Sequence, residues 1–212
     1  ATSRDAAGKV RTQTWDAMGR LTNVDDLNAG AIAITYDAAS NPVRRTDAAG
    51  NVVVTSFDPL QRRVAQFSEA DEAGTKRTWQ YDLLTGCAEC TNAGGKLVRK
   101  TWPGSTAGGD DAIGYDAEGR NVFRRRTLGG KAFVFRNAFD DADREISTIY
   151  PGGLSIERTF DGADRVSGIA NIVGHLGYDE RGNPNRAEYA NGTTNTWTWD
   201  ADAELATLEA TD

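Results

Sequence analysis

The sequence is short of the residues that build a conventional hydrophobic core or a helix. Of its 212 residues, Leu, Ile, Val and Phe together contribute 38, or 18%, and 30 of the other apolar residues are Ala. Leucine occurs 11 times and lysine 5 times, whereas glycine occurs 23 times, threonine 22 times and aspartate 21 times. A composition poor in helix formers and rich in turn and strand residues predicts an all-β chain.

Three further absences exclude whole classes of protein. No run of 18 apolar residues occurs, so we expect no membrane insertion. Residues 1–20 contain no apolar stretch between a basic start and a small-residue cleavage site, so no signal peptide is visible. The 31 acidic and 24 basic residues give a net charge of -7, which argues against a nucleic-acid partner, although Arg124–Arg126 forms one local basic cluster.

The chain is organised as a sequence repeat. An aromatic residue followed by Asp recurs nine times, and successive Asp residues are 21, 21, 24, 34, 24, 21, 18 and 21 positions apart. A common period of 21 is typical of a repeat array. The nine pairs are Trp15-Asp16, Tyr36-Asp37, Phe57-Asp58, Tyr81-Asp82, Tyr115-Asp116, Phe139-Asp140, Phe160-Asp161, Tyr178-Asp179 and Trp199-Asp200.

The residues after each aromatic have the chemistry of a turn. A carboxylate can accept backbone N–H groups two residues further on, and Gly supplies the positive φ that a type I turn followed by a bulge requires. Where Gly is missing, Ser40, Gln61, the segment 141–143 or Asp164 must adopt the same geometry. Among the nine aromatic–Asp pairs, the glycines that follow the Asp by three positions are Gly19, Gly119 and Gly182.

The residues before each aromatic alternate with a period of two, as in a half-buried strand. Ile32, Ile34 and Tyr36 share one predicted face, as do Thr55 and Phe57. Twenty-one residues divide into two strands of about six residues and two turns, so each repeat is predicted to be one β-hairpin. Nine hairpins give about eighteen strands, too many for a flat open sheet, so we expect a curled or spiralling antiparallel sheet. We predict a single array over residues 1–212 with an irregular insertion at about 83–112.

Segments such as Tyr115-Asp116-Ala-Glu-Gly-Arg120, repeated along essentially the whole chain, resemble the YD or RHS repeat. This repeat belongs to bacterial Rhs and WapA-type toxins, to the shell proteins of insecticidal toxin complexes and to the teneurins. The resemblance implies a hollow shell around a toxic segment, or a cell-surface contact module, in a secreted or cell-surface bacterial protein. It implies no enzymatic activity and no cofactor.

The chain also departs from the complete family. Toxin-releasing members end the repeat region in a self-cleavage element built on Asp-Pro motifs, whereas the only Asp-Pro here is Asp58-Pro59, inside an ordinary repeat. Both ends break within a repeat, at residues 4–9 and after Asp200. We therefore expect a fragment of a longer protein, with the remainder of that parent chain as its partner.

Cys87-Ala-Glu-Cys90 is the most distinctive local element, inside the longest spacing of the repeat. Two cysteines at this separation suit a local disulfide, a redox pair or half of a zinc site. A zinc site needs about four ligands, and the chain offers two Cys and one distant His. We expect a local disulfide, which an exported protein permits, with free thiols and metal or redox use as the alternatives.

Other candidate sites have a structural explanation as well as a functional one. His175 is the only histidine and lies in strand context without a nucleophile motif, so no catalytic residue is predicted. The acidic segments 110–111 and 140–143 lack the spacing of a calcium loop, so no metal is predicted. Asn191-Gly192-Thr193 matches a glycosylation sequon, but Asn-Gly also favours a type I′ hairpin turn.

Three functions are consistent with these features. The leading hypothesis is a non-enzymatic structural module that builds a shell or a surface stalk. The alternative is a carbohydrate-binding or adhesion module, because five Trp residues are present and pairs such as Trp197 and Trp199 share a predicted face. A third hypothesis is self-association through unpaired sheet edges into oligomers or filaments.

Overall fold

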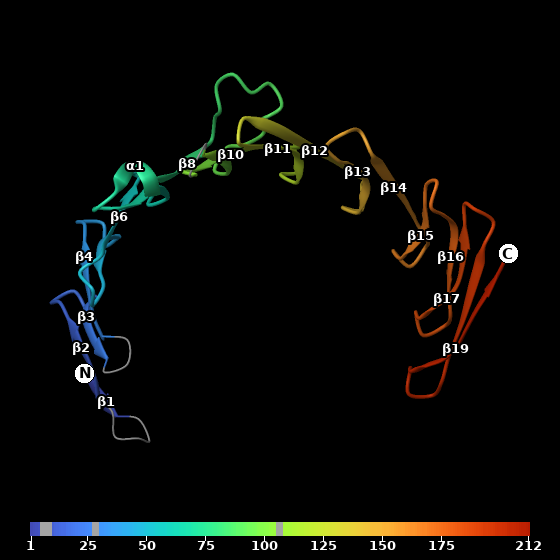
Figure 1. Cartoon of the computed structure of the whole chain (residues 1–212), viewed down its shortest axis with the longest axis horizontal. Coiled ribbons are helices and arrows are strands. Elements are labelled where there is room, and N and C mark those ends of the chain that lie inside the picture. The colour runs from blue at the N-terminus through green and yellow to red at the C-terminus, as the bar shows by residue number, and fades with distance from the viewer. Residues whose placement is uncertain (5–9, 27–29, 105–107) are drawn as a thin grey trace. The chain divides into compact units, whose positions relative to one another are not determined.

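A computed structural model of the chain describes residues 1–4, 10–26, 30–104 and 108–212 (Figure 1). Most of the broken repeat expected at residues 4–9 lies outside this part of the chain, as do residues 105–107 of the expected insertion. Over the described residues, nineteen strands form one open sheet, and a single four-residue helix accompanies them. The all-β fold built from hairpin repeats is therefore confirmed.

The strands follow one another through the sheet in chain order. Each pairing for which a register is established is antiparallel and joins strands consecutive in the sequence, for example β2 with β3 and β17 with β18. The elements are β1 (Thr2–Arg4), β2 (Val10–Trp15), β3 (Leu21–Asp26), β4 (Gly30–Tyr36), β5 (Pro42–Thr46), β6 (Val52–Phe57), β7 (Arg63–Ser68), α1 (Glu72–Thr75), β8 (Arg77–Tyr81), β9 (Leu97–Trp102), β10 (Gly109–Tyr115), β11 (Asn121–Leu128), β12 (Lys131–Phe139), β13 (Glu145–Ile149), β14 (Ser155–Phe160), β15 (Val166–Ile169), β16 (Val173–Tyr178), β17 (Pro184–Tyr189), β18 (Thr194–Trp199) and β19 (Leu205–Thr211).

The chain separates into two compact units. The first comprises residues 1–120 and 124–132, and the second comprises residues 121–123 and 133–212. Strands β1–β10 belong to the first unit and β13–β19 to the second, while β11 and β12 contain the boundaries. Strand β9 and the first residues of β10 lie within the segment 83–112 that the sequence predicted to be irregular.

Side chains alternate across the strands as predicted. In β4 the residues Ile32, Ile34 and Tyr36 are half-buried and those between them are exposed. Residues directly opposite each other in an antiparallel pair point to the same face, which places Arg63 on the face of Phe57 and Lys100 on the face of Trp79. We call this side of the first unit the aromatic face, since it carries Tyr36, Phe57, Trp79, Tyr81 and Tyr115.

The buried core is small and local, which explains the low content of large apolar residues. Nine hydrophobic residues are buried among those the structure describes, and Val98 is fully inaccessible. Five of the nine come from the insertion and the two strands beneath it: Leu84, Cys90, Ala93, Val98 and Ala112. Elsewhere the backbone ladder carries the order from strand to strand, as in other repeat proteins.

Candidate functional site

The Asp of each repeat organises a tight turn, and Asp58 shows the pattern. Its N–H donates to the carbonyl of Arg62 at 2.9 Å, and its carbonyl accepts from the N–H of Gln61 at 2.9 Å. Its Oδ1 accepts the N–H groups of Leu60 and Arg62, both at 2.9 Å. The carboxylate therefore satisfies two backbone donors that the turn would otherwise leave unpaired.

In eight of the nine repeats the residue three positions after the Asp takes the left-handed conformation, and the exception is the repeat of Asp82. Gly119 has φ of 88°, which an L side chain rarely adopts. Where the sequence has no Gly, the side-chain-bearing residue takes the same geometry, as the turn chemistry predicts. These residues are Ser40 with φ 68°, Gln61 with 63°, Asp143 with 62°, Asp164 with 61° and Ala203 with 62°.

The residue four positions after the Asp extends the turn to the next repeat. Arg62 Nε donates to Asp58 Oδ2 at 2.8 Å, and the Arg62 guanidinium carbon lies 4.4 Å from the ring centroid of Tyr81. The same guanidinium donates to both carboxylate oxygens of Asp82, at 3.1 and 2.7 Å. One arginine thus binds its own turn, the aromatic ring of the next repeat and the next Asp.

We call this arrangement the clasp: the Asp, the residue four positions later and the aromatic residue of the next repeat. It recurs in both units. The arginine lies over the next ring at 4.8 Å for Arg20 and Tyr36, 4.8 Å for Arg144 and Phe160, and 4.3 Å for Arg165 and Tyr178. Because these contacts recur from repeat to repeat, the clasp is a general feature of the array and not a local accident of one turn.

The polar end of the aromatic side chain adds a hydrogen bond to the clasp. The Tyr36 hydroxyl donates to the carbonyl of Leu21 at 2.8 Å, and the Tyr178 hydroxyl donates to that of Val166 at 2.8 Å. In the last aromatic pair, Trp199 Nε1 donates to the carbonyl of Pro184 at 2.7 Å. In each case the acceptor is the residue five positions after the preceding Asp. These bonds were not predicted from the sequence, although the basic residue after the turn is a signal for the clasp.

The insertion is built into the turn of one clasp. The Asp82 N–H donates to the carbonyl of Lys96 at 3.0 Å, and Asp82 Oδ1 accepts the N–H of Gly95 at 2.7 Å. Lys96 Nζ then lies 5.2 Å from the ring centroid of Tyr115. Lys96 therefore takes the place of the arginine. The extra residues between Asp82 and Gly95 form a loop, which we call the excursion, and this loop begins and ends at an ordinary turn.

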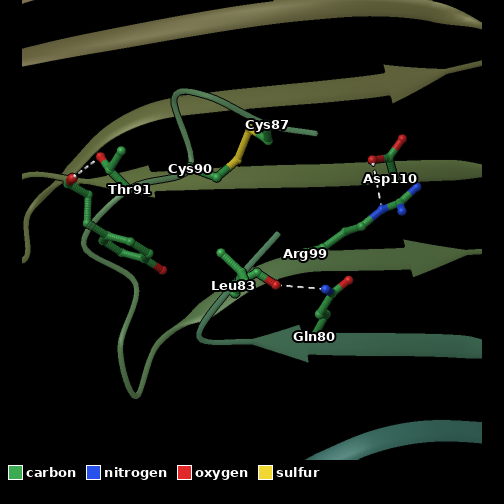
Figure 2. The surroundings of a disulfide bond; sticks show 8 residues. Gln80, Leu83, Cys87, Cys90, Thr91, Arg99 and Asp110 are labelled. Atoms are coloured by element: carbon green, nitrogen blue, oxygen red, sulfur yellow. Dashed lines mark hydrogen bonds and ion pairs between the residues drawn. A yellow bond between two sulfur atoms is a disulfide. The ribbon is translucent and has the colours of Figure 1, made fainter. Parts of the chain in front are cut away.

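This excursion lies against the sheet next to β10 and contains the predicted disulfide, Cys87–Cys90 (Figure 2). Figure 2 also shows the Arg99–Asp110 ion pair, which joins β9 and β10 with an Nε–Oδ2 distance of 3.3 Å. The Thr91 carbonyl accepts the N–H of Tyr115 at 3.1 Å, and the Thr91 hydroxyl donates to the Tyr115 carbonyl at 3.0 Å. The structure thus contains a Cys87–Cys90 disulfide, and the loop is attached to the end of β10.

The clasp environment lowers the pKa of the turn carboxyls. For Asp161, the hydrogen bonds from the Arg165 side chain and backbone outweigh desolvation and hold the pKa at about 2. For Asp58, desolvation alone would raise the pKa, but the bonds from Arg62 and Leu60 outweigh it, and the pKa is lowered. Each clasp carboxylate is thus stabilised in its charged form.

The other candidate residues are engaged structurally. Asp111 is buried and accepts from Arg124 and Arg126 at 2.7 Å, and His175 is exposed on β16. In the described part of the chain, no group of three or more His, Cys, Asp or Glu side chains is placed to hold a metal ion. Among the described residues, no helix has the length and apolar character needed to cross a membrane.

The type I′ prediction for the Asn191-Gly192 turn is wrong. That turn type requires positive φ at both central residues, but only Gly192 has it, at 94°. The Tyr189 N–H donates to the carbonyl of Thr193 at 2.8 Å, and the Gly192 N–H donates to that of Tyr189 at 3.0 Å. This is the backbone pattern of the Asp turns, so both ends of a hairpin use the same geometry.

Removing one clasp hydroxyl is expected to weaken the fold measurably. Tyr178→Phe keeps the ring under Arg165 but leaves the Val166 carbonyl without its donor, at a cost of about 1 kcal/mol in the free energy of unfolding. Urea unfolding followed by circular dichroism measures this loss. Tyr150→Phe is the matched control, since the Tyr150 hydroxyl makes no hydrogen bond among the described residues. Equal stability of the two variants would show that the hydroxyl bond contributes nothing.

The chain is similar in structure to the Tc toxin proteins TcdB2-TccC3. It matches TcdB2-TccC3 with a TM-score of 0.68 and 13% identity over 100% of its own length and 14% of that chain. It matches TcdB2-TccC3-TEV with a TM-score of 0.67 and 15% identity over 94% of its length and 11% of that chain. The chain therefore spans about a seventh or less of these structures. No protein-family model and no curated protein matches its sequence.

Proposed function

Because the chain has the YD/RHS-repeat fold of the Tc toxin shell proteins, we propose that it is a non-enzymatic wall segment of a shell or surface stalk. The parent would be an exported bacterial protein such as a polymorphic toxin. The observation that carries this proposal is the recurrence of the clasp, which attaches neighbouring hairpins to each other in both units. Such a wall can be lengthened by adding hairpins, without a central core.

The polar residues of the repeat are used within the array. Arg62 binds Asp58, Tyr81 and Asp82, and the Tyr81 hydroxyl donates to the carbonyl of Arg63 at 3.0 Å. Side chains held in this way are poorly suited to proton transfer or nucleophilic attack, which require a group free to react. The repeat chemistry therefore favours a mechanical role over a catalytic one.

Small-angle X-ray scattering tests the wall proposal. A compact globule of this length has a radius of gyration of about 17 Å. A wall built without a central core is expected to be more extended than such a globule, so the proposal predicts a radius of gyration clearly above this value. A radius at the globular value would overturn the proposal.

The export proposal is tested by fractionating the producing bacterium. An antibody should detect the protein on the cell surface or in the medium, and detection in the cytosol alone would contradict export.

Self-association is a second candidate, and strand β19 favours it. β19 pairs with β18 through six residue pairs, and its seven residues are all exposed. Leu205 and Leu208 are 51% and 56% exposed. An open strand edge with apolar side chains can pair with a strand of the parent chain or of a second copy. Light scattering coupled to size exclusion should then show mass increasing with concentration, and a strict monomer at high concentration would remove this candidate.

A further inference from the structure

The Cys87–Cys90 disulfide encloses very few residues. Its two cysteines are three positions apart and both belong to the excursion, so the bond joins no two strands of the sheet. The stabilisation that a disulfide gives by constraining the unfolded chain grows with the number of residues it encloses, and here that number is small. We therefore expect its main effect to be local, on the position of the excursion.

The two ends of the excursion are anchored to the sheet by hydrogen bonds. At its start, Gln80 Nε2 donates to the carbonyl of Leu83 at 2.7 Å (Figure 2). Toward its end, the Thr91 hydroxyl and Asn92 Nδ2 both donate to the carbonyl of Tyr115 at 3.0 Å. These bonds hold the excursion on both sides of the disulfide.

The middle of the excursion has no such anchor. Gly86 and Ala88, on either side of Cys87, are exposed, and among the described residues they make no hydrogen bond to a strand. The Cys87 N–H donates to the carbonyl of Leu84 at 3.3 Å, which is a bond within the excursion. The disulfide is therefore the link that ties this segment to the anchored second half of the loop.

The two cysteines differ in the access that they offer to a reagent. Cys90 is buried, with 6% of its surface exposed, and its backbone lies against Gly114, where an added Cβ would be 3.2 Å from Cα of Cys90. Cys87 is half-buried and lies between two exposed residues. Because the rate of thiol–disulfide exchange depends on access to the attacked sulfur, attack at Cys87 with Cys90 as the leaving group is favoured.

We propose that the Cys87–Cys90 bond is a latch that a dithiol reductant opens while the sheet stays folded. A thiolate of the reductant attacks Cys87 Sγ, the bond between the two cysteines breaks, and Cys90 leaves as a thiolate that takes up a proton. The second thiol of the reductant loses its proton and attacks the mixed disulfide, which frees the Cys87 thiol. The protein disulfide gains two electrons, and the dithiol is oxidised to its own disulfide.

Opening of the latch would release residues 84–88 and leave the second half of the excursion on β10. Leu84 is 9% exposed in the closed loop and would become accessible beside Leu83, which is already 67% exposed. The reduced chain would thus present two adjacent leucines where the oxidised chain presents one. For an exported wall segment, a reducing compartment such as the cytosol of another cell would open the latch. This use rests on the export proposed above, whereas the latch itself does not.

Limited proteolysis of the full chain with chymotrypsin tests the latch. Dithiothreitol under native conditions should make two thiols available to N-ethylmaleimide and leave the circular dichroism unchanged. After removal of the reagents, cleavage after Leu84 should be about tenfold faster or more than in the oxidised chain, because the open segment can enter the protease. Cleavage after Leu60, which is 69% exposed in another turn, should keep its rate. Cys87→Ser combined with Cys90→Ser should be cleaved after Leu84 at the fast rate without any reductant.

Two single variants test the order of attack. Cys90→Ser leaves Cys87 as the only thiol, and Cys87→Ser leaves Cys90 as the only thiol. Iodoacetamide should alkylate Cys87 about tenfold faster or more than Cys90, since Cys90 stays buried against Gly114. Equal rates in the two variants would contradict Cys87 as the attacked residue.

Three results would overturn the latch. The first is a bond that dithiothreitol reduces only after urea has unfolded the sheet. The second is loss of β-structure on reduction, which would make the bond a support of the whole sheet. The third is equal cleavage after Leu84 in the oxidised chain, the alkylated chain and the double variant. None of these results bears on the wall proposal, which the radius of gyration of the oxidised chain tests separately.

Discussion

Between about pH 4 and pH 2, the chain is expected to lose its β-structure, while its stability changes little between pH 7 and pH 5. The reason is that the turn carboxylates have a lowered pKa in the folded state, because backbone N–H groups and Arg or Asn side chains bond to the charged form. Those with lowered pKa are Asp16, Asp37, Asp47, Asp58, Asp82, Asp116, Asp140, Asp161 and Asp179.

The sign of the effect follows from the difference between the folded and unfolded states. An unfolded Asp titrates near its ordinary pKa of 3.8, whereas Asp161 in the fold has a pKa of about 2. Above the unfolded pKa both states are ionised and the full stabilisation is present. As the pH falls toward the folded pKa, the unfolded chain binds more protons, so stability is lost. Nine carboxylates acting in the same direction make this the largest expected response of the molecule.

Urea unfolding at a series of pH values, followed by circular dichroism, measures this dependence. Asp161→Asn removes one carboxylate and should make the loss of stability between pH 4 and pH 2 shallower, since one fewer group takes up a proton on unfolding. Stability that is unchanged down to pH 2, or that falls already between pH 7 and pH 5, would contradict the role assigned to these carboxylates.

Gly114→Ala is expected to detach the disulfide-containing loop from the sheet. A Cβ built at Gly114 would overlap the carbonyl oxygen of Glu89 and lie 3.2 Å from Cα of Cys90. These neighbours are backbone atoms, held by the Cys87–Cys90 bond and by the hydrogen bonds of Thr91 with Tyr115, so they cannot turn aside as a side chain would. The free energy of unfolding should fall by about 3 kcal/mol, at the upper end of overpacking effects.

Thermal and urea unfolding of Gly114→Ala measure this loss, and Gly94→Ala is its control. Gly94 lies in the same excursion and does not have a positive φ, and a Cβ added there would have no neighbouring atom within 4 Å. Its replacement should leave stability within about 0.5 kcal/mol of the original chain. If the two variants are equally stable, the loop does not pack on β10 as described.

The sequence predicted the repeat, the strands and the turns because these depend on local chemistry. The carboxylate of Asp58 and the left-handed residue Gln61 lie within four residues of each other, so their relation can be inferred from the turn pattern. The nineteen observed strands agree with the expectation of about eighteen. The curling of the whole sheet remains a prediction.

The contacts between repeats could not be predicted in the same way. Arg62 meets Tyr81 only when the two hairpins pair in a specific register, and local propensity does not set that register. The place of Lys96 in a clasp was hidden because the excursion separates it from Asp82 by 14 positions, which removes the usual spacing.

Removal of one complete repeat tests the array most directly. Deleting residues 38–58 takes out 21 residues and joins Asp37 to Pro59, so that Arg62 occupies the position four residues after the remaining Asp. The clasps of Arg20 with Tyr36 and of Arg62 with Tyr81 are then both retained. Circular dichroism of the shortened chain should show the same β-structure and cooperative unfolding as the original. Loss of that β-structure would contradict an array held together by contacts between neighbouring repeats.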